Sequence, residues 1–313
     1  MSASISGIFP ALTTPFEKGE LSESQLKSNM EKFESIKLSG YLVLGSTGES
    51  VLMNDGERLK AIETVRASAS EGKTVIAGTG MQSTRGTIEF TNLAADVGAD
   101  YALVITPFYF KKQMTAQNLE NYYREVAEKS RIPILMYNVP KFTGLDLPIK
   151  AIISLADHPN IVGLKDSSGD IALLTELIRA CPTEFIILQG SGSVLFTSLM
   201  LGAQGGILAL SNFAPAETVE IFQMVNAGDP ERGREIQMRL ITLNEKIVNT
   251  FGVPGIKCAL DLVGYFGGHP RPPLQPVDQE MKETIRHLIE DAGLRGGPGP
   301  SLTGRSRTPK GEA

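Results

Sequence analysis

Short apolar runs alternate with longer segments of helix-like spacing, and this alternation constrains the fold of the 313-residue chain most strongly. The runs are Ile8–Thr13, Tyr41–Leu44, Thr74–Ala77, Tyr101–Ile105, Pro133–Tyr137, Ile161–Lys165, Phe185–Leu188 and Gly206–Leu210. They are apolar throughout, as expected of strands that are buried on both faces. The segments between them are Ser22–Ile36, Asp55–Ser68, Ser83–Val97, Thr115–Lys129, Leu147–Asp157, Ile171–Ala180, Val194–Leu201 and Pro215–Ala227. This pattern predicts an α/β fold, a parallel (β/α)8 TIM barrel.

A doubly wound open sheet is the alternative architecture. It would carry a glycine-rich dinucleotide fingerprint after its first strand. Residues Ala11 to Phe16 contain no glycine, so the pattern favours the barrel. Ser22, followed three residues later by Gln25, further predicts a capping box at the start of the first helix.

The repeating pattern ends near Gly228, which suggests three parts to the chain. Residues 1–227 would form the barrel and residues 228–294 a helical C-terminal extension. Helices are expected at Glu231–Thr250, Lys257–Gly264 and Asp278–Ala292. Residues 295–313 have almost no apolar content, and we expect them to be a disordered tail.

Composition argues against several classes of function. The formal net charge is −5, whereas a nucleic-acid-binding protein needs a basic face. No apolar stretch approaches 18 residues and no signal-peptide pattern begins the chain, so we expect a cytoplasmic protein without a membrane span. The three histidines and two cysteines lack the spacing of metal ligands, which predicts no metal site.

The most informative polar residues are Lys165 and Tyr137, each at the end of an apolar run and 28 positions apart. That spacing is about one βα unit, so both side chains should reach the same end of a parallel barrel. An amine inside an apolar barrel loses part of its preference for the charged form. An amine beside a phenol that can carry protons suits imine chemistry on a 2-oxo acid.

Other predicted strand ends carry hydroxyl groups and glycines. Gly45 to Glu49 is either an ordinary turn or a loop whose hydroxyls and amides hold an anion such as a carboxylate. Gly190 to Ser193 is either a phosphate-binding loop of a phosphosugar enzyme or a turn where two segments approach closely. Asp166 would orient its neighbours by hydrogen bonding.

These residues resemble the dihydrodipicolinate synthase / N-acetylneuraminate lyase family of pyruvate-type class I aldolases, over about Gly7 to Leu294. Three motifs carry the resemblance. They are Gly45-Ser46-Thr47-Gly48-Glu49, like the pyruvate-binding loop, Tyr137-Asn138-Val139-Pro140, like the tyrosine signature, and Gly163-Leu164-Lys165-Asp166-Ser167, like the Schiff-base signature.

The resemblance implies roles for individual residues. Lys165 would form the imine, Tyr137 would shuttle protons, and Thr47 would relay them. Tyr109 would complete the relay in a neighbouring subunit of a homotetramer or dimer of dimers. Ser46 and Thr47 would bind the substrate carboxylate, and Ser167 would contact the far end of the substrate. The backbone carbonyl of Ile207 would face the imine, and Gly190 would also contact the substrate. No cofactor is implied.

One position departs from the lysine-pathway synthases, which have an arginine two residues after the proline of the tyrosine signature. Here that position is Phe142, which cannot make a bidentate contact with a carboxylate. The segments Thr143 to Pro148, His158 to Gly163 and Phe251 to Lys257 most resemble 4-hydroxy-2-oxoglutarate aldolases. The resemblance therefore favours a lyase that cleaves or forms a 4-hydroxy-2-oxo acid, with 4-hydroxy-2-oxoglutarate aldolase first. The alternatives are 4-hydroxy-tetrahydrodipicolinate synthase, with another basic residue in place of the arginine, and a 2-keto-3-deoxy sugar acid aldolase. A binding protein that lost catalysis is a further alternative, which the presence of Lys165, Tyr137 and Thr47 disfavours.

Overall fold

The computed structural model describes residues 5–294, and within them eight parallel strands form a single barrel. The strands are β1 (Gly7–Pro10), β4 (Gly40–Val43), β5 (Thr74–Gly78), β6 (Tyr101–Ile105), β7 (Ile134–Asn138), β8 (Ile161–Asp166), β9 (Ile186–Gln189) and β10 (Gly205–Leu208). From β4 to β10 each strand pairs with the next along the chain, and β10 pairs with β1. A bridge between Ala11 and Leu42 closes the seam between β1 and β4. The predicted (β/α)8 barrel is confirmed.

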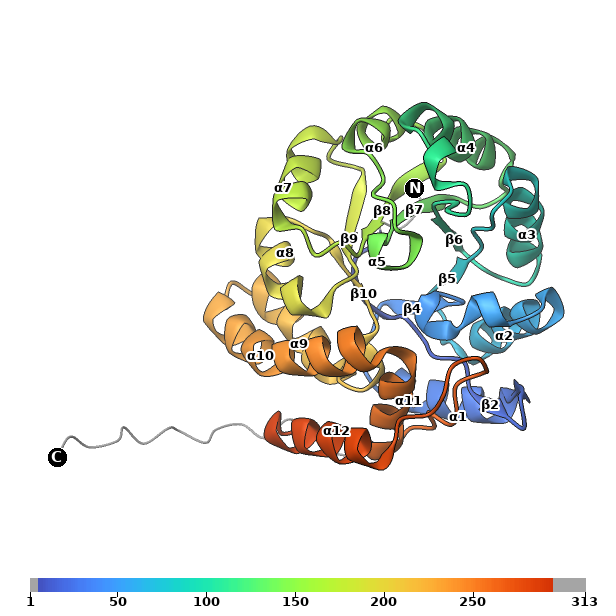
Figure 1. Cartoon of the computed structure of the whole chain (residues 1–313). Coiled ribbons are helices and arrows are strands. Elements are labelled where there is room, and N and C mark those ends of the chain that lie inside the picture. Colours follow the sequence, from blue (N-terminus) through green and yellow to red (C-terminus); the bar gives the residue numbers. More distant parts are fainter. Residues whose placement is uncertain (1–4, 295–313) are drawn as a thin grey trace.

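Helices surround the strands, as the view along the barrel in Figure 1 shows. They are α1 (Glu23–Glu34), α2 (Asp55–Ser68), α3 (Thr84–Asp96), α4 (Ala116–Lys129), α6 (Ile149–Leu155), α7 (Ile171–Ala180), α8 (Leu195–Leu201) and α9 (Pro215–Asn226). A short helix, α5 (Pro140–Thr143), follows β7. A small hairpin of β2 (Phe16–Glu17) and β3 (Glu20–Leu21) precedes α1 and was not predicted.

The predicted capping box at Ser22 is wrong. The Ser22 hydroxyl makes no cap to α1 and instead donates to the Glu17 carboxylate of the β2–β3 hairpin. A capping box does form at α2, where Asn54 and Glu57 each accept from the other's backbone amide. The hairpin brings a carboxylate to Ser22, which the local sequence pattern does not reveal.

The interior of the barrel is apolar and is filled by one side chain or more from most strands. This cluster includes Phe9, Leu42, Ile76, Leu103, Leu135, Leu188 and Ile207. Tyr137 belongs to the same cluster, at the carboxyl end of β7. The floor of the barrel mouth is therefore a packed apolar layer, and a polar side chain at this level is held away from bulk water.

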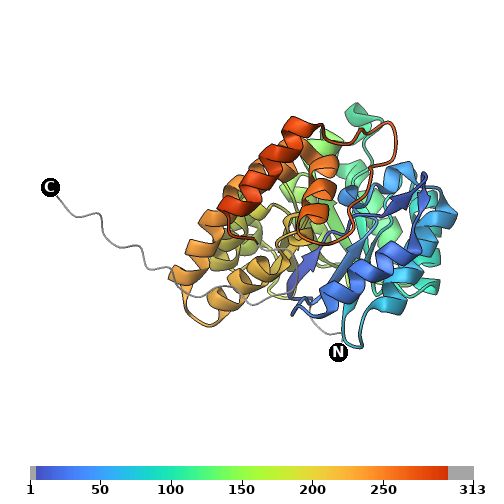
Figure 2. The ribbon, with the colours of Figure 1, turned by 90° about the horizontal axis from the view of Figure 1, so that it is seen from below.

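Three further helices follow the barrel and cover one side of it. They are α10 (Pro230–Leu243), α11 (Gly252–Leu262) and α12 (Gln279–Asp291). Figures 1 and 2 show them as a layer against α8, α9 and α1, coloured orange to red. The expected helix up to Thr250 is present as α10 followed by a π-helix at Asn244–Phe251, and the expected break follows at Gly252, whose backbone has φ 66° and ψ −148°. The next helix, α11, begins there, five residues before the predicted start at Lys257.

The boundary between residues 227 and 228 stays a prediction. The predicted disordered tail, residues 295–313, lies outside the described residues. Among residues 5–294, no helix has both the length and the apolar character needed to cross a membrane.

Candidate active site

The structure brings Lys165 and Tyr137 together at the carboxyl end of the barrel. Their Cα atoms are partners in the ladder between β7 and β8. The Lys165 Nζ lies 4.5 Å from the centroid of the Tyr137 ring, and the two residues are only 4% and 5% exposed. This contact with the ring face positions the Lys165 side chain against Tyr137. The amine and the phenol predicted from the sequence therefore share one buried site.

The next residue on each of these two strands faces outward, and there the strands are joined by a buried polar pair. The Asn138 Nδ2 donates to Asp166 Oδ1 over 2.7 Å, and the Leu147 amide donates to Asn138 Oδ1 over 3.0 Å. The Ser168 hydroxyl donates to Asp166 Oδ2. Burial raises the pKa of the Asp166 carboxyl, while the hydrogen bonds from Ser168 and Asn138 oppose that rise. Asp166 thus orients its neighbours, as the sequence suggested.

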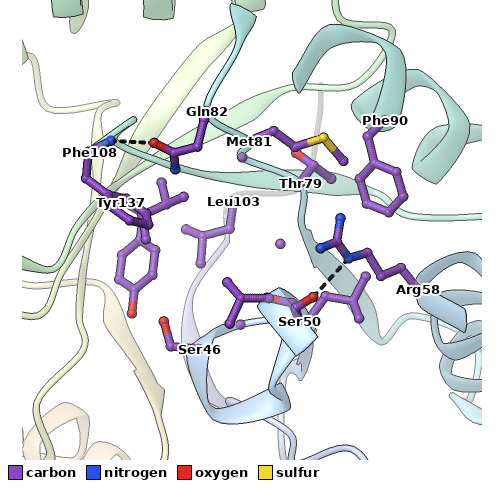
Figure 3. Close-up of a pocket in the computed structure, with 16 residues that line it drawn as sticks. Ser46, Ser50, Arg58, Thr79, Met81, Gln82, Phe90, Leu103, Phe108 and Tyr137 are labelled. Carbon is purple, nitrogen blue, oxygen red and sulfur yellow. Dashed lines mark hydrogen bonds between the residues drawn. The ribbon is translucent and has the colours of Figure 1, made fainter. Parts of the chain in front are cut away.

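The loop after β4 lies at the same barrel mouth as Lys165 and Tyr137. Ser46–Gly48 form one 3-10 turn, and Figure 3 shows the Tyr137 phenol directed towards the Ser46 side chain. The Thr14 hydroxyl donates to the Gly48 carbonyl over 2.6 Å and anchors the turn to the segment that follows β1. Ser46 and Thr47 are both partly accessible. The loop therefore presents the Ser46 hydroxyl towards the Tyr137 phenol at the mouth of the barrel.

A cavity of about 320 Å³ extends from Ser46 and Tyr137 into the space between β5, β6 and the start of α2. Its far wall carries Arg58 and Phe90, with the Arg58 guanidinium 5.7 Å from the Phe90 ring centroid. The Arg58 Nε donates to the Ser50 carbonyl, as Figure 3 shows. Sequence reasoning missed Arg58, because an arginine in the first turns of a surface helix is ordinarily solvated.

The structure places Gly190 against Ser167. A Cβ built on Gly190 would lie 1.9 Å from the Ser167 hydroxyl oxygen, and the Gly190 amide donates to the Asp166 carbonyl over 2.6 Å. The Ser193 hydroxyl donates to the Glu245 carboxylate. An amide that is already bonded and a nearby carboxylate both disfavour a phosphate, so the close-approach interpretation of Gly190 to Ser193 fits better.

Other predicted site residues lie at different depths. Ile207 is fully buried on β10, one residue before the strand ends. Tyr109 is 75% exposed, packs edge-on against Phe110 and does not line the cavity of this single chain. Phe142 is 56% exposed on α5. The relay through Thr47 and Tyr109 and the role of the Ile207 carbonyl stay predictions.

A buried charge cluster lies directly behind the loop. Glu49 and Lys257 are each 1% exposed at their side chains, with 2.8 Å between Glu49 Oε1 and Lys257 Nζ. The Lys257 ammonium also donates to the carbonyl oxygens of Thr14 and His269, so it has three oxygen partners within the described chain. Burial lowers the pKa of Lys257, and Glu49 opposes that effect. The sequence analysis missed this cluster, and a single lysine within an apolar helix is the signal that could have revealed it.

Comparison of the sequence with known proteins identifies related proteins along almost the whole chain. The sequence model of the dihydrodipicolinate synthetase family matches residues 4–292. A 4-hydroxy-tetrahydrodipicolinate synthase from Thermodesulfovibrio yellowstonii is 35% identical over 289 residues, 92% of this chain and 98% of that protein. One from Methanothrix thermoacetophila is 36% identical over 286 residues, 90% of this chain and 95% of that protein.

The fold leads to the same group of proteins. The crystal structure of a prophage protein of the dihydrodipicolinic acid synthase family from E. coli K12, in complex with pyruvate, superposes with a TM-score of 0.88 and 30% identity. That similarity covers 93% of this chain and 100% of the prophage protein. The match to the family model and to full-length relatives, together with the shared barrel, assigns the chain to the dihydrodipicolinate synthetase family.

Proposed function

We propose that this protein is a class I aldolase that binds pyruvate as an imine on Lys165. The observation that carries the proposal is the buried contact between Lys165 Nζ and the Tyr137 ring at the mouth of the barrel. The pyruvate complex of the prophage relative supports the same ligand for this site.

The residues suggest a sequence of steps. The neutral Lys165 amine adds to the ketone carbon of the 2-oxo acid, and loss of water leaves an imine. Once protonated, the imine accepts electron density from the adjacent carbon, so that a methyl proton leaves and an enamine forms. The enamine then attacks an aldehyde to make a carbon–carbon bond, and the reverse sequence cleaves one. Tyr137 is positioned to move the protons, while Ser46 and Thr47 hold the carboxylate.

Two overall reactions have support. The names of the similar proteins favour 4-hydroxy-tetrahydrodipicolinate synthase, whose second substrate is aspartate semialdehyde. For that substrate, Lys141 is the basic residue closest in sequence to the missing arginine, and its Nζ donates to the Asn249 carbonyl over 2.8 Å. The second candidate, cleavage of 4-hydroxy-2-oxoglutarate, is supported by the similarity of Thr143 to Pro148 to that group of aldolases and by Phe142, exposed where the synthases have their arginine.

Chemical trapping tests the common step. The protein is incubated with pyruvate, reduced with borohydride, digested and mapped by mass spectrometry. We expect a reduced pyruvate adduct on Lys165 and none in Lys165→Arg. A matched control is Lys129→Arg, which alters an exposed lysine on α4 and should still be labelled at Lys165. Labelling of other lysines with Lys165 unmodified would refute the proposal.

Turnover assays distinguish the acceptors. If the protein is the synthase, condensation of pyruvate with aspartate semialdehyde should far exceed pyruvate release from 4-hydroxy-2-oxoglutarate. In that case Lys141→Met should raise the KM for the semialdehyde and leave the half-saturation for pyruvate unchanged. Faster pyruvate release than condensation would instead identify the 4-hydroxy-2-oxoglutarate aldolase.

We also infer that the active form contains at least two copies of the chain. The Tyr109 ring is exposed beside Phe110, which is itself 65% exposed, and Val51 at the rim of the cavity is 77% exposed. Exposed apolar side chains close to a site suit contact with a second copy. A homotetramer, as the family resemblance implies, would place Tyr109 in a neighbouring site.

A further inference from the structure

The strongest unexplained feature is the buried ammonium of Lys257. Its α-helix, α11, belongs to the C-terminal extension, yet its Nζ reaches the barrel and donates to the Thr14 carbonyl over 2.8 Å. It also donates to the His269 carbonyl over 3.0 Å and lies 4.6 Å from the Phe16 ring centroid. A lysine that is 0% exposed is retained only with strong partners, because burying a charge is costly.

The partner of Lys257 is Glu49, the last residue of the predicted carboxylate-binding loop. Its backbone has φ 57° and ψ 28°, a left-handed conformation that is uncommon for a residue with a Cβ. Such a conformation persists only where the surroundings fix it. Here the Glu49 amide donates to the Ser46 carbonyl, its Oε2 accepts from the Arg271 amide over 2.7 Å, and its Oε1 meets Lys257.

The extension is itself fitted closely around Lys257. A Cβ on Gly267 would lie 1.8 Å from the Lys257 carbonyl oxygen, so the segment after α11 lies directly against the helix backbone. The Arg271 guanidinium covers the Phe16 ring at 4.2 Å and pairs with Glu57 at the start of α2. These contacts fix the ammonium relative to the barrel.

We propose that the Glu49–Lys257 ion pair is a positioning device, through which the C-terminal extension sets the direction of the Ser46 and Thr47 groups that bind the substrate carboxylate. Neither residue touches the reacting atoms. The pair fixes the end of the turn, while the hydrogen bond from Thr14 fixes its Gly48 carbonyl. The functional part of this inference rests on the proposed binding of pyruvate.

Pyruvate-dependent trapping at Lys165 tests the proposal. In Lys257→Met we expect the pyruvate concentration for half-maximal labelling to rise about tenfold, with the maximal labelling of folded protein unchanged. Glu49→Gln keeps an acceptor for the Arg271 amide, so it should fold and show a smaller rise in the same direction. Ile289→Ala, a buried change in α12 remote from the pair, serves as the matched control and should keep the wild-type value.

A second pair of readouts separates positioning from simple loss of folded protein. The double variant Glu49→Gln/Lys257→Met removes both buried charges, so its melting temperature should recover relative to Lys257→Met while its half-saturation stays raised. Hydrogen exchange at residues 45–50 should quicken in Lys257→Met and not in Ile289→Ala. This measurement needs no substrate.

The outcomes distinguish the two proposals. Absence of any adduct in the wild-type protein would refute the pyruvate chemistry, and the exchange measurement would still decide whether the pair orders the loop. Half-saturation within twofold of wild type in both Lys257→Met and Glu49→Gln, or unchanged exchange at residues 45–50, would overturn the positioning role.

Discussion

Replacing Asn138 by alanine should damage both stability and imine formation. Asn138 is fully buried and joins the two strands that carry Tyr137 and Lys165. The Asn138→Ala variant leaves Asp166 Oδ1 without the donor at 2.7 Å and the Leu147 amide without its acceptor at 3.0 Å. A bond to an ionised group contributes about 1.5–3 kcal/mol, and an unpaired buried amide costs about 1–3 kcal/mol. The free energy of unfolding should therefore fall by about 4 kcal/mol.

Urea denaturation followed by circular dichroism measures this loss. Imine trapping at a pyruvate concentration that saturates the wild-type protein should slow by about tenfold or more, because small displacements of reacting groups have large effects on rate. Asn160→Ala is the control. Asn160 precedes the other end of β8 and donates to the Ala127 carbonyl over 2.8 Å, so its loss should reduce stability without slowing trapping. A loss below about 1 kcal/mol in Asn138→Ala, or equal trapping rates in both variants, would refute this reasoning.

Three further predictions concern individual side chains. Tyr137→Phe keeps the ring beneath Lys165 but removes the hydroxyl, so enamine formation, measured as deuterium exchange of the pyruvate methyl group, should slow about 10²- to 10⁴-fold; an unchanged rate would contradict the proton-shuttle role. Tyr109→Phe should lower turnover while the free energy of unfolding stays within about 0.5 kcal/mol of wild type, because Tyr109 is largely exposed; wild-type turnover would argue against a role in a neighbouring subunit. Burial raises the pKa of Asp166 in the folded protein, so the folded state keeps this proton to higher pH than the unfolded state does. The free energy of unfolding should therefore fall as pH rises from the unfolded pKa near 4 to the raised folded pKa. Asp166→Asn should flatten this part of the stability–pH curve measured by urea denaturation, and a curve parallel to wild type would exclude Asp166 as its source.

The sequence was sufficient to predict the barrel and its central pair. Apolar runs mark strands that are buried on both faces, and helical periodicity marks their connections, because each signal is local to its element. In a parallel barrel all strand ends meet at one rim, so the positions of Lys165 and Tyr137 at the ends of two runs were enough to bring them together. Gly190 remained ambiguous in the sequence, since only the position of Ser167 decides that the glycine serves close packing.

The remaining features depend on contacts between distant segments. The hydroxyl of Ser22 caps no helix because Glu17 of the unpredicted hairpin takes its hydrogen bond. The π-helical form of Asn244–Phe251 has no local sequence signal, although the break after it at Gly252 lies close to the predicted helix end at Thr250. Glu49 carries no mark of its burial, which results from Lys257 and Arg271, more than 200 positions later in the chain. Pairings of this kind become visible only in three dimensions.

The hydrogen bond from Lys257 to the Thr14 carbonyl spans 243 positions, and this separation affects the order of events during synthesis. The ribosome produces the barrel strands first and the lysine that completes their rim last. A nascent chain that has emerged only as far as α9 contains Lys165, Tyr137 and the entire Ser46–Gly48 turn, but not the cation that neutralises Glu49. Competence to bind a 2-oxo acid would therefore arise after translation is nearly complete, when the extension docks on the finished barrel.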